Sequence, residues 1–387
     1  MCKLGTLAEI VRGASPRPIQ DSKWFDNTSD VGWLRISDVT EQNGRIYKLE
    51  QKLSKAGQEK TRVLRKPHLL LSIAATVGKP VVNYVNTGVH DGFLIFLNPL
   101  FDREFMFQWL EMFTSKWQKY GQPGSQVNLN SELVRNQELR IPSTNEQEKI
   151  GTLFKQLDDT ITLHQRKLDQ LKELKTAYLQ VIFPVKDERV PKLRFADFEE
   201  EWELCKLGDL ANIVGGGTPN TNNPKCWDGN IDWYAPAEIK EKIYVTGSKK
   251  RITELGLQKS SAKVLPIGTV LFTSRAGIGN TAILAKKGTT NQGFQSIIPN
   301  KNKLDTYFIF SRTHELKKYG EAVGAGSTFV EVSGKQMAKM PMLTPRFNEQ
   351  QAIGMFFKKI DDIITLHQNK LEQLKDLKTS YLQNMFI

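Results

Sequence analysis

The residues best suited to binding chemistry lie in a loop at positions 215–225. This loop combines three consecutive glycines with Thr218, Asn220, Asn222 and Lys225. Backbone amides and small polar side chains of this kind can reach phosphate oxygens or base edges, and an asparagine can make two hydrogen bonds to adenine. The alternative is an ordinary turn, which uses the same residue types.

Four arginines add positive charge to this set. Arg275 stands at the end of a predicted strand, where it could read guanine or hold a phosphate. Arg12 and Arg17 lie in residues 12–18, a more basic counterpart of the 215–225 loop that is poorer in asparagine. Arg35 lies in a predicted strand. The candidate DNA contacts are therefore Arg12, Arg17, Arg35, Thr218, Asn220, Asn222, Lys225 and Arg275.

The sequence predicts no catalytic residue. It contains no G-x-x-x-x-G-K-[ST] phosphate loop, no G-x-G-x-x-G after a strand, no H-E-x-x-H and no G-x-S-x-G. The neighbouring carboxylates Asp158 and Asp159, and likewise Asp361 and Asp362, lie on predicted helices, where adjacent side chains do not face each other. We interpret them as a solvated face or a contact surface for a partner. A binding protein without a metal or cofactor of its own is the prediction.

Composition is consistent with this prediction. The formal charge of +12 fits either a nucleic-acid binder or a basic solvated surface. No apolar run approaches 18 residues and no signal pattern follows Met1, so we expect a soluble intracellular protein without a membrane span. Cys2, Cys205 and Cys226 form no C-x-x-C pair, and their odd number argues against a disulfide framework.

A duplication positions the candidate loops. Residues 145–184 and 348–387 are identical at 26 of 40 aligned positions, at a constant offset of 203 residues. The same offset relates residues 3–11 to residues 206–214, so the whole chain consists of two repeats. The two helical segments barely differ, whereas the globular segments share only a framework. This contrast indicates one shared role for the helices and a different target for each globular part.

Each duplicated segment predicts one long helix with a heptad stripe. Spacings of three and four residues keep the stripe facing a partner helix, and the obvious partner of each copy is the other copy. The seam residues are Ile150, Phe154, Leu157, Ile161, His164, Leu168 and Leu171, and then Ile353, Phe357, Ile360, Ile364, His367, Leu371 and Leu374. The stripe continues to Tyr381 and Met385 in the second copy.

Helix ends and length follow from local signals. Asn145 and Asn348 are the predicted N-caps. About 35 residues at about 1.5 Å per residue give a rod of roughly 50 Å. His164 and His367 fall inside the seam, where a polar residue usually sets register or partner choice. No second ligand lies nearby at helical spacing, so we do not expect a metal site there.

The globular segments have short β-branched or aromatic runs bounded by Gly, Pro, Asn and Asp, which are typical of strands. In the first segment we expect strands at 33–39, 69–75, 81–85 and 93–97, a helix at 103–120 and a loop at 121–130. In the second segment we expect strands at 232–235, 264–274, 281–285 and 294–298 and a helix at 304–319. Helix and strand together predict a mixed α/β (α+β) fold.

Several motifs together indicate a known family. Both helices carry N-E-Q-x-x-I-G, Asp-Asp, L-x-x-L-K and Y-L-Q, and the second globular segment opens on Lys206-Leu207-Gly208-Asp209 followed by Gly216-Gly217-Thr218-Pro219. The turn at 272–279 and a charged, proline-containing lead-in at 191–202 complete the set. The chain resembles, across its full length, the specificity (S) subunits of type I restriction-modification systems.

The resemblance implies two globular target recognition domains separated by a pair of long antiparallel coiled-coil helices, with pseudo-two-fold symmetry. The implied divisions are 1–144 (recognition domain 1), 145–184 (spacer helix 1), 185–205 (linker and lead-in), 206–347 (recognition domain 2) and 348–387 (spacer helix 2). Each domain would read one half of a bipartite site in double-stranded DNA. The lead-in has no counterpart before Cys2, which departs from the family pattern.

The resemblance also implies a division of labour in the cytoplasm of a bacterial or archaeal cell. The spacer helices would dock methyltransferase (M) subunits that use S-adenosylmethionine for adenine methylation. Restriction (R) subunits would bring ATP- and Mg-dependent translocation and cleavage. Two alternatives remain open: an S subunit of a methylation-only or recombination-silenced system, and a coiled-coil adaptor whose globular parts bind proteins.

Overall fold

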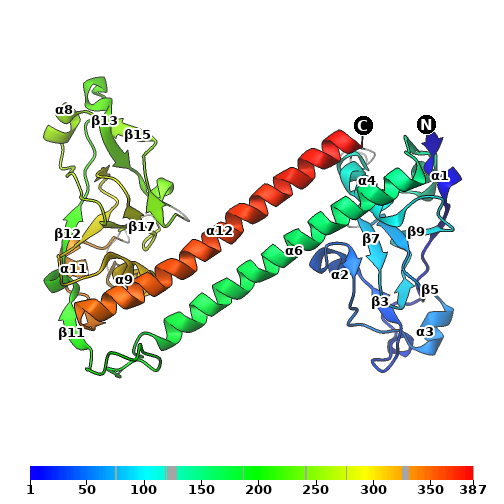
Figure 1. Cartoon of the computed structure of the whole chain (residues 1–387), viewed down its shortest axis with the longest axis horizontal. Helices are drawn as coiled ribbons and strands as arrows, with labels where there is room; N and C mark the ends of the chain where they lie inside the picture. The colour runs from blue at the N-terminus through cyan, green and yellow to red at the C-terminus, as the bar shows by residue number, and fades with distance from the viewer. Residues whose placement is uncertain are drawn as a thin grey trace. The chain divides into compact units, whose positions relative to one another are not determined.

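The computed structural model describes residues 1–74, 76–117, 119, 129–185, 187–239, 242–275, 277–324 and 331–386. The chain divides into two compact units, Met1–Arg166 with Gln368–Ile387, and Lys167–His367. Each unit contains one globular part and a part of each long helix, α6 (Thr144–Val181) and α12 (Phe347–Met385) (Figure 1). The loop expected at 121–130 lies outside the described residues except for its last two positions.

The first unit is built on a five-stranded sheet with the order β2-β9-β6-β7-β4. These strands are β2 (Glu9–Arg12), β9 (Phe93–Leu97), β6 (Leu69–Ser72), β7 (Pro80–Asn83) and β4 (Arg45–Ile46). A three-stranded sheet contains β3 (Gly32–Leu34), β8 (Thr87–Val89) and β5 (Arg62–Leu64), and β1 (Cys2–Lys3) pairs with β10 (Glu138–Leu139). The helices are α1 (Leu4–Leu7), α2 (Ile36–Glu41), α3 (Lys55–Glu59), α4 (Arg103–Trp117) and α5 (Ser131–Asn136).

The second unit repeats this topology with the order β12-β19-β16-β17-β14. These strands are β12 (Ala211–Gly215), β19 (Gln295–Pro299), β16 (Val270–Phe272), β17 (Thr281–Leu284) and β14 (Tyr244–Val245). The smaller sheets contain β15 (Lys250–Ile252), β13 (Trp227–Tyr234) and β18 (Thr289–Thr290), and β11 (Glu203–Lys206) with β20 (Pro341–Thr344). The helices are α7 (Leu207–Leu210), α8 (Glu254–Gln258), α9 (Thr306–Ser311), α10 (Thr313–Gly324) and α11 (Gly334–Ala338).

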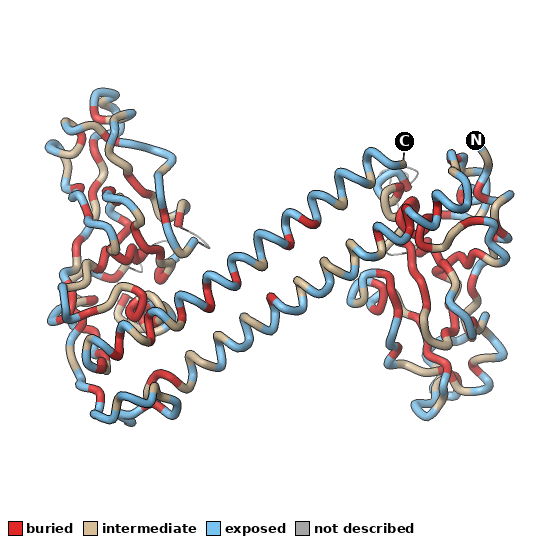
Figure 2. The backbone as a smooth tube through the Cα atoms, viewed as in Figure 1, coloured by how far each residue is buried: buried red, intermediate tan, exposed pale blue. Residues whose placement is uncertain are grey.

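Both faces of the main sheet are buried in the first unit. Leu69 and Leu71 of β6 pack in the same cluster as Leu110 of α4, whereas Leu70 packs with Ile95 on the opposite face. This alternation follows from the two-residue period of a strand. Figure 2 shows the buried residues gathered on the strands of each globular part and recurring at intervals along the long helices.

The two long helices are antiparallel in each unit. In the first unit, Lys378 near the end of α12 pairs with Asp158 in the first half of α6, at 2.6 Å. In the second unit, Lys175 near the end of α6 pairs with Asp361 in the first half of α12, also at 2.6 Å. The predicted pairing of the two helical copies, within a mixed α/β protein of two repeats, is confirmed.

The predicted heptad stripe faces inward over most of its length. The fourteen seam residues from Ile150 to Leu171 and from Ile353 to Leu374 are all buried or half-buried. At the end of α12 the prediction is wrong, because Tyr381 and Met385 are 37% and 40% exposed and Phe386 turns inward instead. An α-helix has 3.6 residues per turn rather than 3.5, so a strict heptad stripe drifts around a straight helix.

The predicted N-caps are wrong. α6 begins at Thr144 and α12 at Phe347, so Asn145 and Asn348 lie inside the first turns. A glutamine one turn later in each helix links the start of that helix to the globular part by hydrogen bonds. Gln147 donates from Nε2 to the carbonyl of Pro142 and accepts at Oε1 from the amide of Asp102, both at 2.9 Å. Gln350 makes the equivalent bonds in the second unit at 3.0 Å, so tertiary contacts decide where the helices begin.

Two other predicted elements are corrected. The strand expected at 33–39 ends at Leu34, because the carboxylate of Asp38 accepts from the amide of Arg35 at 2.8 Å and starts α2. The helix expected at 304–319 is two helices, α9 and α10, which meet at the buried Arg312. The strand at 93–97 and the start of the helix at 103 are confirmed. Among the described residues, no helix is long and apolar enough to span a membrane.

Candidate nucleic-acid interface

Two neighbouring loops form the candidate interface in the first unit: the loop after β2 and the loop between β8 and β9. They approach so closely that a Cβ on Gly13 would stand 2.1 Å from the carbonyl oxygen of His90. Ser15 Oγ donates to Asp91 Oδ1 at 2.8 Å, and Arg17 pairs with Asp91 Oδ2 at 2.9 Å. Asp91 therefore organises the loop that contains the predicted basic contacts.

The second unit has the same pair of loops. A Cβ on Gly216 would stand 2.0 Å from the carbonyl oxygen of Asn291, so this position also requires glycine. Thr218 Oγ1 donates to Gln292 Oε1, in the way that Ser15 donates to Asp91 in the first unit. The loop after β12 is thus held by a neutral amide where the first unit uses a carboxylate.

The two units keep the backbone of the second loop and change its side chains. In the first unit, the Gly92 amide donates to Nδ1 of His90 at 2.8 Å. In the second unit, the Gly293 amide donates to Oδ1 of Asn291, also at 2.8 Å. A carboxylate accepts hydrogen bonds only, whereas an amide side chain both donates and accepts. One scaffold therefore offers a ligand different groups in the two units.

Arg17 and Arg35 line one cleft of about 610 Å³ together with Trp33, His90 and Asp91. The Arg17 side chain is 80% exposed and that of Arg35 is 39% exposed. A hydrogen bond to Asp38 raises the pKa of Arg35 and holds its guanidinium at the start of α2. Cations beside aromatic rings are the combination that binds phosphates and stacks on bases.

His90 and Asp91, in the loop between β8 and β9, each have a defined protonation state. Burial lowers the pKa of His90, so its imidazole is neutral at neutral pH. Because Nδ1 accepts from the backbone, the proton lies on Nε2. Burial opposes ionisation of Asp91, but the hydrogen bond from Ser15 and the charge of Arg17 hold the pKa of Asp91 below its usual value. The cleft therefore presents an imidazole N–H and a carboxylate side by side.

Arg12 connects the loop pair of the first unit to neighbouring residues by hydrogen bonds. Its Nε donates to the carbonyl of Asp91 at 2.5 Å, and its own carbonyl accepts from Arg62 at 2.8 Å. The structure thus places all three predicted arginines of the first unit near the loop pair. Arg17 and Arg35 line the cleft, and Arg12 is exposed and bonded to the backbone of Asp91.

Arg275 lies beside the equivalent loop of the second unit. A Cβ on Gly293 would stand 3.6 Å from Arg275 Nε, and the Arg275 guanidinium is 4.0 Å from Glu331 while its side chain is 37% exposed. Its counterpart in the first unit is Ala74, since the residues just before it, Ser274 and Ile73, make matching amide bonds to glycine carbonyls at 2.8 and 2.9 Å. This arginine is present in one repeat only.

Asn220, Asn222 and Lys225 lie on the next turn of the same loop. Asn220 Oδ1 accepts from the amide of Asn222 at 3.0 Å, and the Asn220 carbonyl accepts from the indole of Trp227 at 3.1 Å. Asn222 and Lys225 are exposed. The structure therefore brings Thr218 and Arg275 to one loop and places the other three residues on the adjoining turn.

The sequence analysis missed four residues of this site: His90, Asp91, Asn291 and Gln292. A signal was present, because His90-Asp91-Gly92-Phe93 aligns with Asn291-Gln292-Gly293-Phe294. The Gly-Phe pair is kept while the two residues before it change. The two repeats therefore present different side chains from the same backbone position.

The interpretation of both carboxylates of each Asp-Asp pair as a solvated face is corrected. Only Asp159 and Asp362 lie on the solvated face, in ion pairs with lysines four residues earlier. Asp361 is 3% exposed and accepts from the Tyr307 hydroxyl at 2.9 Å. Asp158 accepts from Gln108 at 2.7 Å and pairs with Arg45 at 3.2 Å. The first carboxylate of each pair therefore binds its helix to the globular part.

In the described part of the chain, no group of three or more His, Cys, Asp or Glu side chains could hold a metal ion. His164 and His367 are half-buried in the helical seam. The site is therefore a surface of exposed cations, amides and aromatic rings around a loop pair that occurs twice.

The chain contains two copies of one α/β module, each with a loop pair whose side chains differ between the copies. The model of the type I restriction modification DNA specificity domain matches residues 1–173 and 199–376. The chain belongs to this family.

Individual relatives agree with the family match. The MjaIX specificity subunit of Methanocaldococcus jannaschii is 33% identical over 191 residues, which cover 49% of this chain and 44% of that protein. The EcoR124I/EcoR124II specificity subunit of Escherichia coli is 28% identical over 208 residues, 49% of this chain and 50% of that protein. The chain thus spans about half the length of these curated relatives. The type I restriction-modification S subunit from M. genitalium has the same fold, with a TM-score of 0.68 at 13% identity over 100% of this chain and 95% of that chain.

Proposed function

We propose that this chain is the DNA specificity subunit of a type I restriction-modification complex and that each repeat reads one half of a split duplex target. The main support is an unchanged loop backbone that presents different side chains, His90 and Asp91 in one repeat and Asn291 and Gln292 in the other. Base pairs differ in the donors and acceptors that they expose in the major groove. One scaffold with two sets of groups can therefore read two different half-sites.

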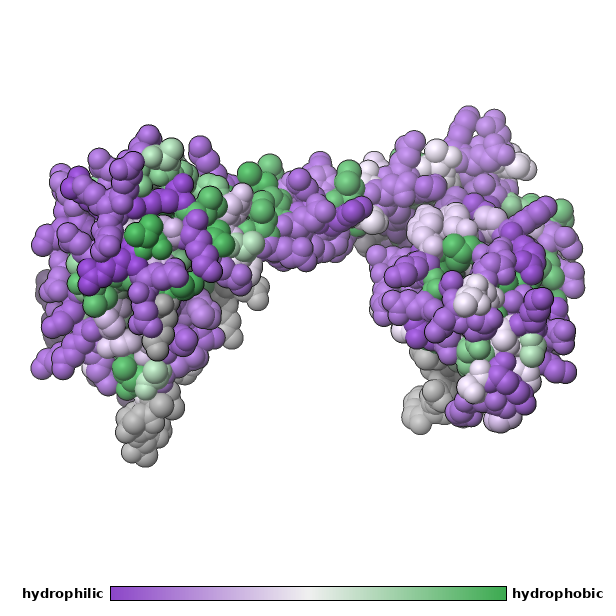
Figure 3. All heavy atoms as spheres, turned by 90° about the horizontal axis from the view of Figure 1, so that it is seen from below, coloured by the Kyte–Doolittle hydropathy of each residue, from purple (hydrophilic) through white to green (hydrophobic). Residues whose placement is uncertain are grey.

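The proposal assigns the chemistry to partner subunits. The chain itself provides no catalytic residue, and S-adenosylmethionine, ATP and Mg act on the methyltransferase and restriction subunits, in the cytoplasm of the host cell. Docking of partners on the helices is supported by apolar residues that both repeats expose at equivalent positions. Leu163 and Leu366 are each 66% exposed, and Leu174 and Leu377 are 45% and 41% exposed. Figure 3 includes apolar residues on the surface of the helical part.

The experiment that tests this proposal combines DNA binding with methylome sequencing. A host that expresses the chain with its modification subunit is expected to methylate one bipartite motif. The purified complex should bind that DNA with an affinity that falls steeply with salt, because phosphate contacts release counterions. The chain by itself should transfer no methyl group. If the affinity for DNA did not depend on salt and the host contained no methylated motif, the coiled-coil adaptor would be favoured instead.

Arg275 tests the residue assignment. If its guanidinium reads a base edge, Arg275→Ala should cost about 1–3 kcal/mol of binding free energy and relax one position of one half-site. If it holds only a phosphate, binding should weaken on all sequences, with a salt slope shallower by about one. Competition binding against single-base variants of the motif measures both effects.

The matched control for this variant is Lys301→Ala. Lys301 is exposed at the opposite end of β19 from the 291–293 loop, so its loss should change neither the motif nor the salt slope. If the two substitutions had equal effects, Arg275 would not be part of the DNA interface.

A further inference from the structure

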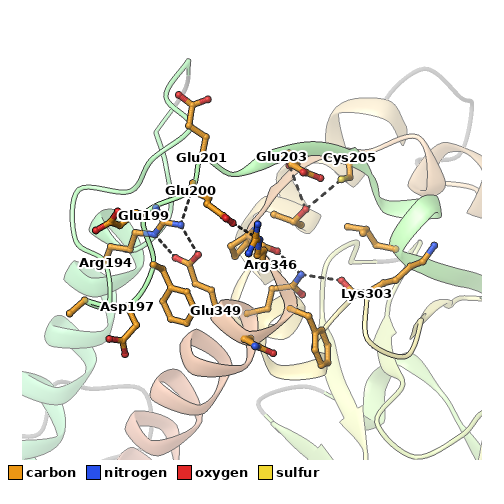
Figure 4. Close-up of a pocket in the computed structure, with 18 residues that line it drawn as sticks. Arg194, Asp197, Glu199, Glu200, Glu201, Glu203, Cys205, Lys303, Arg346 and Glu349 are labelled. Carbon is orange, nitrogen blue, oxygen red and sulfur yellow. Dashed lines mark hydrogen bonds and ion pairs between the residues drawn. The ribbon is translucent and has the colours of Figure 1, made fainter.

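In the described part of the chain, a carboxylate holds three arginines side-on, by hydrogen bonds from Nε and Nη2: Arg35, Arg194 and Arg312. Arg194 and Arg312 join segments of the second unit. Figure 4 shows Arg194 pointing toward Glu349, to which it donates twice at 2.8 Å. The side chains of these two arginines are 12% and 6% exposed, so they serve the fold. The Arg35 side chain is 39% exposed, so its remaining donors are open to a ligand.

Arg35 keeps the outer end of its guanidinium free. Its Nε and Nη2 donate to the carboxylate of Asp38 at 3.3 and 3.0 Å, and Asp38 is 2% exposed. A guanidinium has five N–H groups in a fixed fork, so both N–H groups of Nη1 and one of Nη2 remain. No described residue accepts a hydrogen bond from Nη1. Since Arg35 lines the cleft with Trp33, His90 and Asp91, a ligand in that cleft can accept from it.

The free end of the Arg35 guanidinium matches a guanine better than a phosphate. Guanine exposes two acceptors, O6 and N7, in the major groove, and an arginine can contact both at once. Affinity for phosphate arises mainly from net positive charge, which the buried carboxylate of Asp38 offsets here. The directional hydrogen bonds remain, and the guanidinium is fixed before DNA arrives, so binding costs less conformational entropy. The arrangement therefore favours base reading over backbone binding.

The second unit keeps the carboxylate at this place and lacks the arginine. Ala235 directly follows β13 as Arg35 directly follows β3. The Ala235 amide donates to Glu238 at 2.9 Å, as the Arg35 amide donates to Asp38 at 2.8 Å. The other oxygen of Glu238 accepts from the backbone amide of Lys249 at 2.6 Å. The local fold therefore needs the carboxylate but not the arginine.

The second unit brings an arginine to its loop pair from a different element. Arg275 follows β16, and its counterpart in the first unit is Ala74. A Cβ on Gly293 would stand 3.6 Å from Arg275 Nε and 3.1 Å from Pro236, the residue after Ala235. The two modules thus place an arginine beside equivalent loops from different directions. Bases that these two arginines read would therefore fall at different positions of their half-sites.

We propose that Arg35 reads a guanine in the half-site of the first repeat and that Asp38 is the residue that positions its guanidinium. This proposal deepens the proposed function and rests on it. Asp38 acts through Arg35 rather than by contact with a base. The second repeat has alanine at the same place and reads no base from it.

The test uses the purified complex of the chain with its modification subunit and duplexes that carry the methylated motif or its single-base variants. The half-site of the first repeat is the one that changes when residues 3–144 are exchanged. Arg35→Ala should weaken binding to the motif about 5- to 150-fold, the range for one good bidentate base contact. Discrimination should be lost at one G·C pair of that half-site and kept at all other positions. Ala235 in the second unit shows that this backbone accepts alanine.

Asp38→Asn separates a positioning role from a structural one. An asparagine oxygen can still accept from the Arg35 amide, but the charge that holds the guanidinium is lost. Discrimination at the same G·C pair should fall, by less than in Arg35→Ala, without change at other positions. In the double variant Arg35→Ala/Asp38→Asn, no discrimination beyond that of Arg35→Ala should be lost. If Asp38→Asn weakened binding to every duplex in both backgrounds, the positioning role would be wrong.

Arg65→Ala is the matched control. Arg65 pairs with Asp30 at 3.4 Å, is 60% exposed and does not line the cleft, so discrimination should stay unchanged at every position. A first half-site without a G·C pair would overturn the proposal. Equal weakening on all duplexes by Arg35→Ala, with a shallower salt slope, would make Arg35 a phosphate contact and would also overturn it. A complex that binds no motif would contradict the proposed function, and this proposal with it, so the two failures are distinguishable.

Discussion

Exchange of residues 206–347 for the same segment of a related specificity subunit is expected to change one half of the methylated motif completely and to leave the other half unchanged. All strands of the five-stranded and three-stranded sheets of the second unit lie within this segment, so the exchange transfers both recognition loops together with their scaffold. New and old chain meet where β11 pairs with β20, which depends mainly on backbone hydrogen bonds. They also meet where Tyr307 donates to Asp361 and Phe308 packs on Trp202, so a related segment that keeps these two residues is the suitable donor. Methylome sequencing of the host measures the outcome.

The reciprocal exchange of residues 3–144 is the control for this experiment. It should change the opposite half of the motif, because the loop pair around His90 and Asp91 is then replaced while the pair around Asn291 and Gln292 remains. If either exchange altered both halves together, the two repeats would have to read DNA jointly. The proposal of two independent readers would then be wrong.

Removal of the Lys378 charge is expected to produce the largest loss of stability. Lys378 Nζ lies 2.6 Å from Asp158 and 2.7 Å from Glu111, and its side chain is only 14% exposed. In Lys378→Met these two carboxylates lose their shared cation in a buried site. Breaking a fully buried pair costs about 3–5 kcal/mol. Because Glu111 is 34% exposed and Asp158 keeps Arg45 at 3.2 Å, a loss of about 1–3 kcal/mol is expected here. The free energy of unfolding, measured by urea denaturation, should fall by that amount.

Two lysines serve as controls. Lys375 is exposed on the same helix, so Lys375→Met should change stability by less than about 0.5 kcal/mol. Lys175 occupies the equivalent position in the second unit, where it is 26% exposed and its one carboxylate partner among the described residues is Asp361, so Lys175→Met should cost less than Lys378→Met. If Lys378→Met were no more destabilising than Lys375→Met, the cluster would contribute nothing to stability.

The stability difference between the wild type and Lys378→Met should also depend on pH in a defined way. Burial opposes the charge of Lys378, but Glu111 and Asp158 outweigh it and raise the pKa above the ordinary value of 10.5. A group whose pKa is raised by folding stabilises the protein fully below its unfolded pKa. The difference should therefore be constant at neutral pH and, on the alkaline side, decrease as the pH rises through the raised pKa.

The composition of the candidate site could be predicted only in part. Arg17, Thr218 and Arg275 were found because glycine-rich turns and strand ends have local signals in the sequence. Their partners were not found, because Ser15 and Asp91 are 76 residues apart and Thr218 and Gln292 are 74 residues apart. Nothing in the chain near Ser15 indicates which distant loop will lie beside it. Only the pairing of β2 with β9 brings the two loops together.

The sequence by itself determined the duplication, the two long helices and the inward face of their heptad stripe. These features depend on periodic patterns within about 40 residues, and a helix of that length expresses its own pattern wherever it lies. The tertiary structure alone decided where the helices begin, which carboxylate of each Asp-Asp pair is buried, and that Lys378 joins Glu111 across 267 residues. Those outcomes depend on which surfaces come into contact when the chain folds. A polar group that becomes buried at such a contact needs a hydrogen-bond or ion-pair partner there.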